Sequence, residues 1–205
     1  ADHLEQYPLG GPFRLVPAAW SADNQKIYLT TTTDSEATPR GLYAADIRTG
    51  KIEKLSAPLV TPWHLSFSRD RTKITYINFE MNRLDDQSKP STPYSVSMTN
   101  LATGETTELT KSSEYQLANP IFSLDGHTIS YEIRATGEIP YPVSQTQSIG
   151  INSVNVDTKI VTRIISGSHS RPVSMGAWLS NNQLAYTENC PQQCELFVFN
   201  PADQI

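Results

Sequence analysis

The chain has 205 residues, enough to bury a substantial core without help from metals or many disulfides. Its formal net charge of −5 argues against nucleic acid as the main partner, because phosphate binding needs a basic surface. No apolar stretch of the sequence approaches the roughly 18 residues of a membrane span, and the first residues lack the pattern of a secretory signal. Since the chain begins at Ala1 without Met, we expect a piece excised from a longer protein.

A short turn-like motif recurs four times along the chain. The four copies are WSADN from Trp20, FSRDR from Phe67, FSLDG from Phe122 and WLSNN from Trp178. Each copy precedes a run of alternating apolar residues, which is typical of a β-strand. The motif predicts a tight hairpin, since Gly126, Asn24 and Asn182 all tolerate the positive φ that such turns require. Arg71 occupies this position in the second copy, so we expect a different turn there.

A second turn signal repeats in step with the first. Its four copies are LYAADIRTGK, VSMTNLATGE, INSVNVDTK and LFVFNPADQ, in which Asp or Asn closes a β-like run. Such a side chain can accept hydrogen bonds from the backbone that follows it, and we expect an Asx-type turn at Asn155. Two signals that repeat together at intervals of about 50 residues predict a β-propeller. The repeat units span residues 13–56, 57–111, 112–167 and 168–205.

Each unit is predicted to fold into a blade, a four-stranded antiparallel sheet. In the third unit we expect the strands at 115–123, 128–133, 149–156 and 160–166, with Ile129, Tyr131 and Ile133 on one face. No segment has helical periodicity of useful length, so the fold class is all-β. The four blades form either a closed four-bladed ring or a fragment of a larger ring, and we favour the fragment.

The two ends of the sequence bear on that choice. The fourth unit stops at Ile205, where its outermost strand should begin. The segment PFRLV, or its vicinity, could supply a strand from the N-terminal end and close the ring. Without such closure, the open last blade could mediate oligomerisation.

The two cysteines, Cys190 and Cys194, lie between two predicted strands in ENCPQQCELF. A three-residue connection places them at the neck of a hairpin, where paired strands approach within disulfide reach. A metal site is disfavoured because it needs about four ligands and no His lies nearby in sequence. CxxxC also lacks the spacing of the CxxC redox motif. We therefore expect a structural disulfide and an oxidising compartment, such as the periplasm or the cell exterior.

Several of these segments resemble one repeat family. NPIFSLDG (119–126), DIRTG (46–50), NLATG (100–104) and ELT (108–110) resemble the TolB-type, WD-repeat-like β-propeller repeat. The resemblance covers nearly the whole chain from about residue 13, and it departs from the family pattern at WLSNN and in having no Pro after the Ser. It implies a propeller fold, but such propellers serve in partner binding, in sensing and as gates on peptidases.

Long connections are predicted at one face of the propeller. The excess length of the first three units lies between their second and third strands, at 30–41, 80–93 and 134–148. The links between successive units share that face, at 56–64, 111–120 and 166–174. A protein or peptide partner is expected there, because long polar and aromatic loops carry binding functions. The candidate partner-binding residues are Tyr141, Arg171, His64, Arg83 and Tyr115.

Catalytic and metal-binding motifs are absent from the sequence. It contains no Gly-x-Ser-x-Gly elbow, no phosphate-binding glycine loop and no HExxH, so we expect no enzyme activity, no cofactor and no metal. His64 follows Trp63 on a predicted inner strand, where it either lines the central channel or is a hydrogen-bonded structural residue. His127 is expected to be an exposed turn residue.

The sequence thus favours a non-catalytic interaction or sensory domain outside the cytoplasm. The resemblance suggests as its parent a membrane-anchored transcription regulator of the CadC/ToxR-like kind. The alternative is the substrate-gating propeller of a prolyl-oligopeptidase-like serine peptidase. A third possibility is a propeller enzyme that acts at a central metal.

Overall fold

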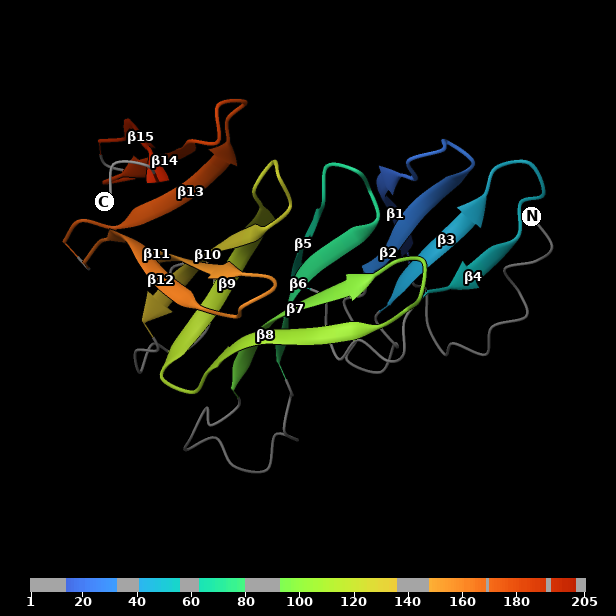
Figure 1. Cartoon of the computed structure of the whole chain (residues 1–205), viewed down its shortest axis with the longest axis horizontal. Helices are drawn as coiled ribbons and strands as arrows, with labels where there is room; N and C mark the ends of the chain where they lie inside the picture. The colour runs from blue at the N-terminus through green and yellow to red at the C-terminus, as the bar shows by residue number, and fades with distance from the viewer. Residues whose placement is uncertain are drawn as a thin grey trace.

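The computed structural model describes residues 14–32, 41–55, 63–79, 93–135, 148–168, 170–190 and 193–201. These residues form fifteen β-strands and contain no α-helix, which confirms the all-β prediction. The strands make four antiparallel sheets, which lie side by side along an open arc from the first sheet (blue) to the fourth (red) (Figure 1). The described part of the chain therefore has the arrangement of a propeller fragment and does not close into a ring.

Consecutive strands are hydrogen-bonded neighbours within every sheet. Sheet 1 consists of β1 (Arg14–Trp20), β2 (Lys26–Thr32), β3 (Leu42–Asp46) and β4 (Ile52–Lys54). Sheet 2 consists of β5 (Trp63–Phe67), β6 (Lys73–Phe79), β7 (Tyr94–Asn100) and β8 (Thr106–Ser112). Sheet 3 consists of β9 (Tyr115–Phe122), β10 (Thr128–Ala135), β11 (Ser148–Asn155) and β12 (Val161–Ser166). Sheet 4 consists of β13 (Val173–Trp178), β14 (Leu184–Glu188) and β15 (Glu195–Phe199).

The structure bears on both ends of the arc. Sheet 4 has three strands within the described residues, in keeping with a fourth unit that stops where its outermost strand should begin. Of the two alternatives for the N-terminal segment, closure of the ring is not observed, because residues 14–16 belong to β1, where Leu15 pairs with Thr31 of β2 in sheet 1. The reason is local, since β1 leads through a short turn directly into β2, and a hairpin of that kind costs little loop-closure entropy.

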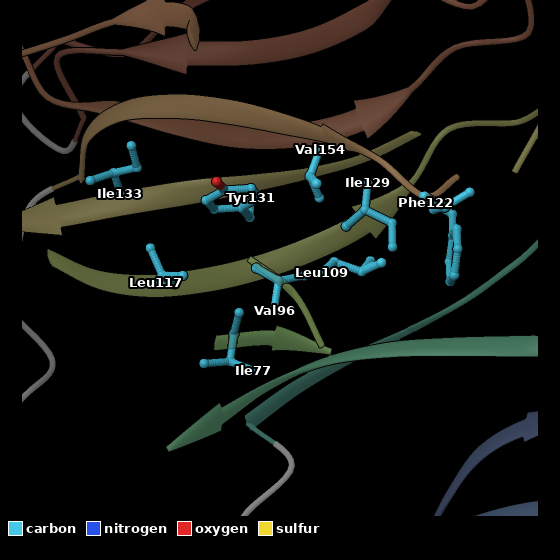
Figure 2. Close-up of a cluster of buried hydrophobic side chains, with 10 residues drawn as sticks. Ile77, Val96, Leu109, Leu117, Phe122, Ile129, Tyr131, Ile133 and Val154 are labelled. Carbon is cyan, nitrogen blue, oxygen red and sulfur yellow. The ribbon is translucent and has the colours of Figure 1, made fainter. Parts of the chain in front are cut away.

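An apolar core lies between each pair of successive sheets. Figure 2 shows the core between sheets 2 and 3, to which Ile77 contributes from β6 and Ile129, Tyr131 and Ile133 contribute from β10. The three residues of β10 share one face, as the alternating pattern predicted. Their neighbour Glu132 points to the opposite face, toward sheet 4. Both faces of β10, the second strand of sheet 3, are therefore covered. The apolar core of the propeller forms separate layers between successive sheets.

The first strand of every sheet has an irregularity in its pairing with the second strand. The register shifts between Pro17 and Ala19 in β1, between Trp63 and Leu65 in β5, and between Met175 and Ala177 in β13. A corresponding shift occurs opposite Tyr131 where β9 pairs with β10. An extra residue of this kind bends the strand and increases its twist. The four first strands thus share a bend two to three residues before their final aromatic residue.

The Ser-x-Asp motif forms the same turn in the first three sheets. The Ser123 hydroxyl donates to Asp125 Oδ1 over 2.6 Å and accepts from the backbone N–H of Thr128 over 3.0 Å. The Asp125 carboxylate also accepts from the N–H of His127 over 3.0 Å. Ser21 and Ser68 donate to Asp23 and Asp70 over the same 2.6 Å in the preceding units. These bonds to the ionised acid lower the pKa of Asp125 below its ordinary value, with the Ser123 hydroxyl as the main cause.

The expectation of a different turn at Arg71 is wrong. Arg71 adopts a φ of 60°, and its N–H donates to the carbonyl of Ser68 over 2.9 Å, as Gly126 does to Ser123 over 3.0 Å. The guanidinium lies over the Phe67 ring at 5.6 Å from its centroid. The Ser68–Asp70 hydrogen bonds and this cation–π contact offset the modest cost of a left-handed conformation at a residue with a side chain.

The second turn signal also acts as predicted. At Asn155 the side-chain oxygen accepts from the N–H groups of Asp157 and Thr158 over 3.0 and 2.9 Å, which confirms the Asx-type turn. The two turns of one unit are joined, because the N–H of Val156 donates to the carbonyl of His127 over 2.9 Å. Equivalent bonds link residues 47 and 25 in sheet 1 and residues 101 and 72 in sheet 2.

Candidate functional site

The two ends of the sheets differ in the connections that they carry. One end, the short-turn end, holds the Ser-x-Asp and Asx turns described above. At the opposite end the first strands begin and the second strands finish, so that Tyr115 pairs with Ala135 and Val173 pairs with Glu188. We call this the long-connection end, because the chain between the second and third strands of sheets 1 to 3 leaves from it. Most of those connecting residues lie outside the described part of the structure.

Two of the five predicted partner-binding residues have described side chains, and both lie at the long-connection end. Tyr115 is the first residue of β9 and is exposed. Arg171 is exposed and stands two residues before β13, in a turn where its N–H donates to the carbonyl of Ser168 over 3.1 Å. The structure therefore places both residues where the sequence predicted a binding face.

The other three cannot be placed in the same way. His64 lies in β5, the first strand of sheet 2, at the irregularity between Trp63 and Leu65, and its side chain is not described. Tyr141 and Arg83 lie outside the described residues. By contrast, His127 is an exposed turn residue, as expected, and its Nδ1 lies 3.3 Å from Asp157 Oδ2.

Arg171 forms an ion pair with the buried carboxylate of Glu188 at the end of β14. The Arg171 side chain remains 60% exposed, whereas that of Glu188 is 7% exposed. The acid thus fixes one side of the guanidinium, and the other side faces solvent. Burial raises the pKa of the neighbouring Tyr186 phenol, and the negative charge of Glu188 raises it further. The phenol consequently stays neutral at physiological pH.

A buried carboxylate that the sequence reasoning missed joins sheets 3 and 4. Glu132 in β10 is 1% exposed. Its Oε1 accepts from the N–H of Met175 over 2.9 Å and from the Ser174 hydroxyl over 3.1 Å, both in β13. Its Oε2 accepts from Nη2 and Nε of Arg134 over 2.9 and 3.3 Å. Both oxygens are therefore occupied by donors, and this acid acts as a structural tie between sheets rather than as a free acid or base.

The signal for this tie was present in the sequence. Glu132 lies in the middle of an alternating strand, between Tyr131 and Ile133. If the sheet packed on one side only, the face that carries Glu132 would be exposed to solvent. A propeller sheet, however, is covered on both faces. A charged residue at that position therefore implies buried partners on the following sheet.

The predicted disulfide joins Cys190 to Cys194, with the two Cα atoms 4.5 Å apart. It closes the connection between β14 and β15 at the long-connection end. The adjacent Asn189 has a φ of 61° and donates its N–H to the carbonyl of Pro172 over 2.9 Å. This contact holds the disulfide turn beside the segment that carries Arg171.

No three His, Cys, Asp or Glu side chains of the described segments lie close enough together to share a metal ion. Nor do those segments include a helix of the length and apolar character that crossing a membrane requires.

Solved β-propeller structures are similar to this chain over most of its length. An oligogalacturonate lyase from Vibrio parahaemolyticus is 14% identical with a TM-score of 0.65, and the match covers 90% of this chain and 50% of that chain. A prolyl endopeptidase is 14% identical with a TM-score of 0.67, covering 93% of this chain and 27% of that one. A protein assigned as TolB from Agrobacterium tumefaciens is 19% identical with a TM-score of 0.57, covering 87% and 58%. No protein-family model and no curated protein sequence matches the chain.

The fold is that of a TolB-like β-propeller. At these identities the likeness concerns the fold alone, since one propeller architecture serves many functions. This chain spans about half the length of the oligogalacturonate lyase and 58% of the TolB structure.

Proposed function

We propose that this chain is a non-catalytic binding domain that captures a protein or peptide segment at its long-connection end. The observation that carries the proposal is the exposed Arg171 guanidinium, which the buried Glu188 carboxylate holds at the same end of the sheets as the exposed ring of Tyr115. At the short-turn end, backbone and side-chain groups are tied into repeated turns. At the long-connection end, an aromatic side chain and a guanidinium are presented to solvent beside the starts of two neighbouring first strands.

The chemistry of Arg171 suits a peptide ligand. A guanidinium has five N–H donors, and the ion pair with Glu188 occupies only one side of it. The remaining donors can bind the carbonyl oxygens or a carboxylate of a peptide. Because Glu188 already orients the group, less conformational entropy is lost on binding than for a free arginine. Tyr115 adds an amphipathic ring of the kind that anchors interfaces.

The proposed location is outside the cytoplasm, and the Cys190–Cys194 disulfide supports it, because such bonds persist in oxidising compartments. A sensory role within a membrane-anchored transcription regulator remains an expectation from the sequence resemblance.

The second candidate is the gating propeller of a serine peptidase, and the similarity of this chain to a prolyl endopeptidase supports it at the level of the fold only. The chain is equally similar to an oligogalacturonate lyase, so the fold does not discriminate between the two candidate functions. The two candidates differ in whether the parent reading frame encodes a hydrolase domain with a Gly-x-Ser-x-Gly elbow.

A displayed library of random peptides tests the binding proposal. We expect the chain to enrich a defined set of peptides, and mass spectrometry should recover them uncleaved. Tyr115→Ala should weaken binding of the enriched peptides at least about tenfold, as loss of an aromatic anchor does. Arg171→Lys should weaken it by a similar factor, because lysine keeps the charge beside Glu188 and loses the planar donors.

The matched control is Arg48→Ala, which removes an exposed arginine from the short-turn end. It should change the affinity less than twofold. If the Tyr115 and Arg171 variants bound the enriched peptides as tightly as the wild-type chain does, the binding site would lie elsewhere. Failure to enrich any peptide, or recovery of cleaved peptides, would contradict the proposal itself.

A further inference from the structure

The Cys190–Cys194 disulfide lies directly beside the ion pair that orients Arg171. Glu188, the acid of that pair, is the last residue of β14, and the disulfide ring begins two residues later. Between the two, the N–H of Asn189 donates to the carbonyl of Pro172 over 2.9 Å, and Pro172 directly follows the arginine. One side-chain contact and one backbone contact, at adjacent positions, therefore hold the disulfide connection against the arginine segment.

The disulfide restrains the residue that makes the backbone contact. Asn189 has a φ of 61°, in the left-handed region that residues with a side chain seldom adopt. The cross-link joins residues four positions apart, so it closes a small ring directly after Asn189. The N–H of Gln193 donates to the carbonyl of Asn189 over 3.1 Å across this ring. Opening the ring frees Asn189 to leave this conformation, in which its N–H is directed at Pro172.

Sheet 4 does not depend on the disulfide for its strand pairing. β14 and β15 pair along their whole length without a register shift, from Leu184 opposite Phe199 to Glu188 opposite Glu195. Leu184 is also buried in the core shared with sheet 3. In the chain-entropy account, a cross-link stabilises a fold by restricting the unfolded chain, and the effect grows with loop length. The loop here is short, so we expect the fold to survive loss of the bond.

Thiol reagents can reach the disulfide, because Cys194 is exposed whereas Cys190 is partly buried. We propose that this disulfide is a reversible modification site, at which a dithiol reductant releases Arg171 from its binding orientation. The proposal rests on the peptide-binding function given above and adds a redox control to it. The oxidised chain is the form that captures a peptide, and the reduced chain binds the same peptide more weakly.

The exchange reaction takes place in two steps at the disulfide sulfurs. A thiolate of the reductant attacks Sγ of Cys194, the S–S bond breaks, and Sγ of Cys190 leaves as a thiolate that takes up a proton. The second thiol of the reductant, as its thiolate, then attacks the mixed disulfide, which releases Cys194 as a thiol and the reductant as its own disulfide. Two electrons and two protons thus pass to the protein, and the reverse exchange restores the bond.

Reduction acts on binding through the order of one side chain. Glu188 stays in β14 and can still pair with the guanidinium, but the backbone contact of Asn189 that holds the two segments together is lost. The Arg171 side chain then samples more orientations, and a peptide has to order it on binding. We expect the dissociation constant to rise about fivefold, the size that ordering one long side chain implies.

Fluorescence anisotropy of an enriched peptide, with and without dithiothreitol, tests the proposal. Reduction of the wild-type chain should raise the dissociation constant about fivefold. The double variant Cys190→Ser/Cys194→Ser should bind as weakly as the reduced chain and should not respond to dithiothreitol. Circular dichroism should show the same β-sheet spectrum for the oxidised chain, the reduced chain and the double variant.

Arg171→Lys shows whether the effect of reduction passes through the guanidinium. Groups that act as one unit have non-additive effects, so reduction should change the affinity of this variant less than about twofold. The control is Tyr115→Ala, whose site lies in β9, away from the disulfide connection. Its weaker binding should still fall by the same factor as that of the wild type. Hydrogen exchange, which needs no peptide, should show faster exchange of the Asn189 amide on reduction and unchanged exchange in β10.

Failure of the redox control can be told apart from failure of the binding function. If no peptide is enriched, the proposed function is wrong and the redox control falls with it. If peptides bind both redox forms equally, or if reduction weakens binding by Arg171→Lys as much as by the wild type, the binding function stands and the redox control is overturned. Unfolding of the reduced chain would also overturn it, by showing that the disulfide serves the fold.

Discussion

The two interfaces that flank sheet 3 both contain an apolar core, but they differ in chemistry at one equivalent position. Ile77 in β6 and Glu132 in β10 hold equivalent register positions, opposite Val96 and Ile151 respectively. Ile77 extends an apolar core between sheets 2 and 3. Glu132 projects a carboxylate from sheet 3 into the gap beside sheet 4, where the backbone and a hydroxyl of β13 bind it.

The difference teaches that the propeller repeat specifies which positions are buried without specifying how they are filled. An apolar side chain gains its stability from area removed from water and tolerates small shifts between sheets. A buried carboxylate is stabilising only when its donors are correctly placed, so it fixes the position of β13 relative to β10. The sheet 3–sheet 4 contact therefore adds oriented hydrogen bonds to its apolar core, whereas the sheet 2–sheet 3 contact is apolar at the equivalent position.

The largest expected loss of stability comes from truncating Ile77 in the apolar core between sheets 2 and 3. Ile77→Ala should lower the free energy of unfolding by about 3 kcal/mol, because it leaves a cavity in a close-packed core. Urea unfolding followed by circular dichroism measures the change. Val161→Ala, at an exposed site in β12, is the control and should change stability by less than about 0.5 kcal/mol. A loss no larger than that of the control would mean that the sheet 2–sheet 3 core relaxes freely.

Removing the Glu132 carboxylate between sheets 3 and 4 should lower the stability somewhat less. Glu132→Ala should lower the free energy of unfolding by about 2 kcal/mol, since it leaves the N–H of Met175 and the Arg134 guanidinium without their acceptor. Arg134 is 20% exposed and can recover part of its hydration. Hydrogen exchange of the Met175 amide measures the local effect, and its protection should fall more than that of amides in β6.

Glu132→Gln provides the control for shape, because the amide keeps one acceptor oxygen and loses the charge. It should fall between the wild type and the alanine variant. If Glu132→Ala were neutral and left the Met175 amide protected, the carboxylate would not be what positions β13.

The smallest expected effect concerns a turn that belongs to neither interface. The pKa of Asp125 is lowered in the folded protein, chiefly by the Ser123 hydroxyl, so its ionised form stabilises the fold at neutral pH. That contribution is present above the ordinary value of 3.8 and is lost as the pH falls through the lower folded-state pKa. Asp125→Asn should therefore lower the thermal midpoint at pH 6, with the corresponding loss of stability below about 1 kcal/mol because the group is exposed.

The difference in midpoint between the wild type and the Asp125→Asn variant should shrink toward zero as the pH falls below 3.8. The fourth turn carries Asn181 at the equivalent position and should contribute no such pH dependence. A constant difference from pH 6 to acid would show that the amide disturbs the turn by its shape rather than by its missing charge.

Much of the fold was predictable because its signals are local. The Ser-x-Asp and Asx turns bond within a few residues, so the motif around Phe122 indicated both the turn and the strands beside it. Arg71 was misjudged because the turn is stabilised by Ser68 and Asp70, and the residue with positive φ needs only to tolerate that conformation. The pairing of β1 with β2 was left open beside closure of the ring, since sequence alone does not say which of two sheets receives a terminal strand.

The candidate site was less predictable, for a related reason. Tyr115 and Arg171 were identified by residue type and by their place in connections, and both prove to lie at the long-connection end. The acid that orients Arg171 was not identified, because Glu188 lies in another strand and its contact is tertiary. Glu132 was missed in the same way, since its partners lie about forty residues further along the chain.

The bond from Val156 to His127 has a consequence for how such a protein can change its length over evolution. Together with its equivalents in sheets 1 and 2, it locks the two hairpins of a unit to each other without help from neighbouring units. Strand register is therefore set inside each unit, and a tandem duplication or deletion of one whole unit leaves the internal alignment of every other unit intact. Ring size can thus vary by gene rearrangement in steps of one repeat.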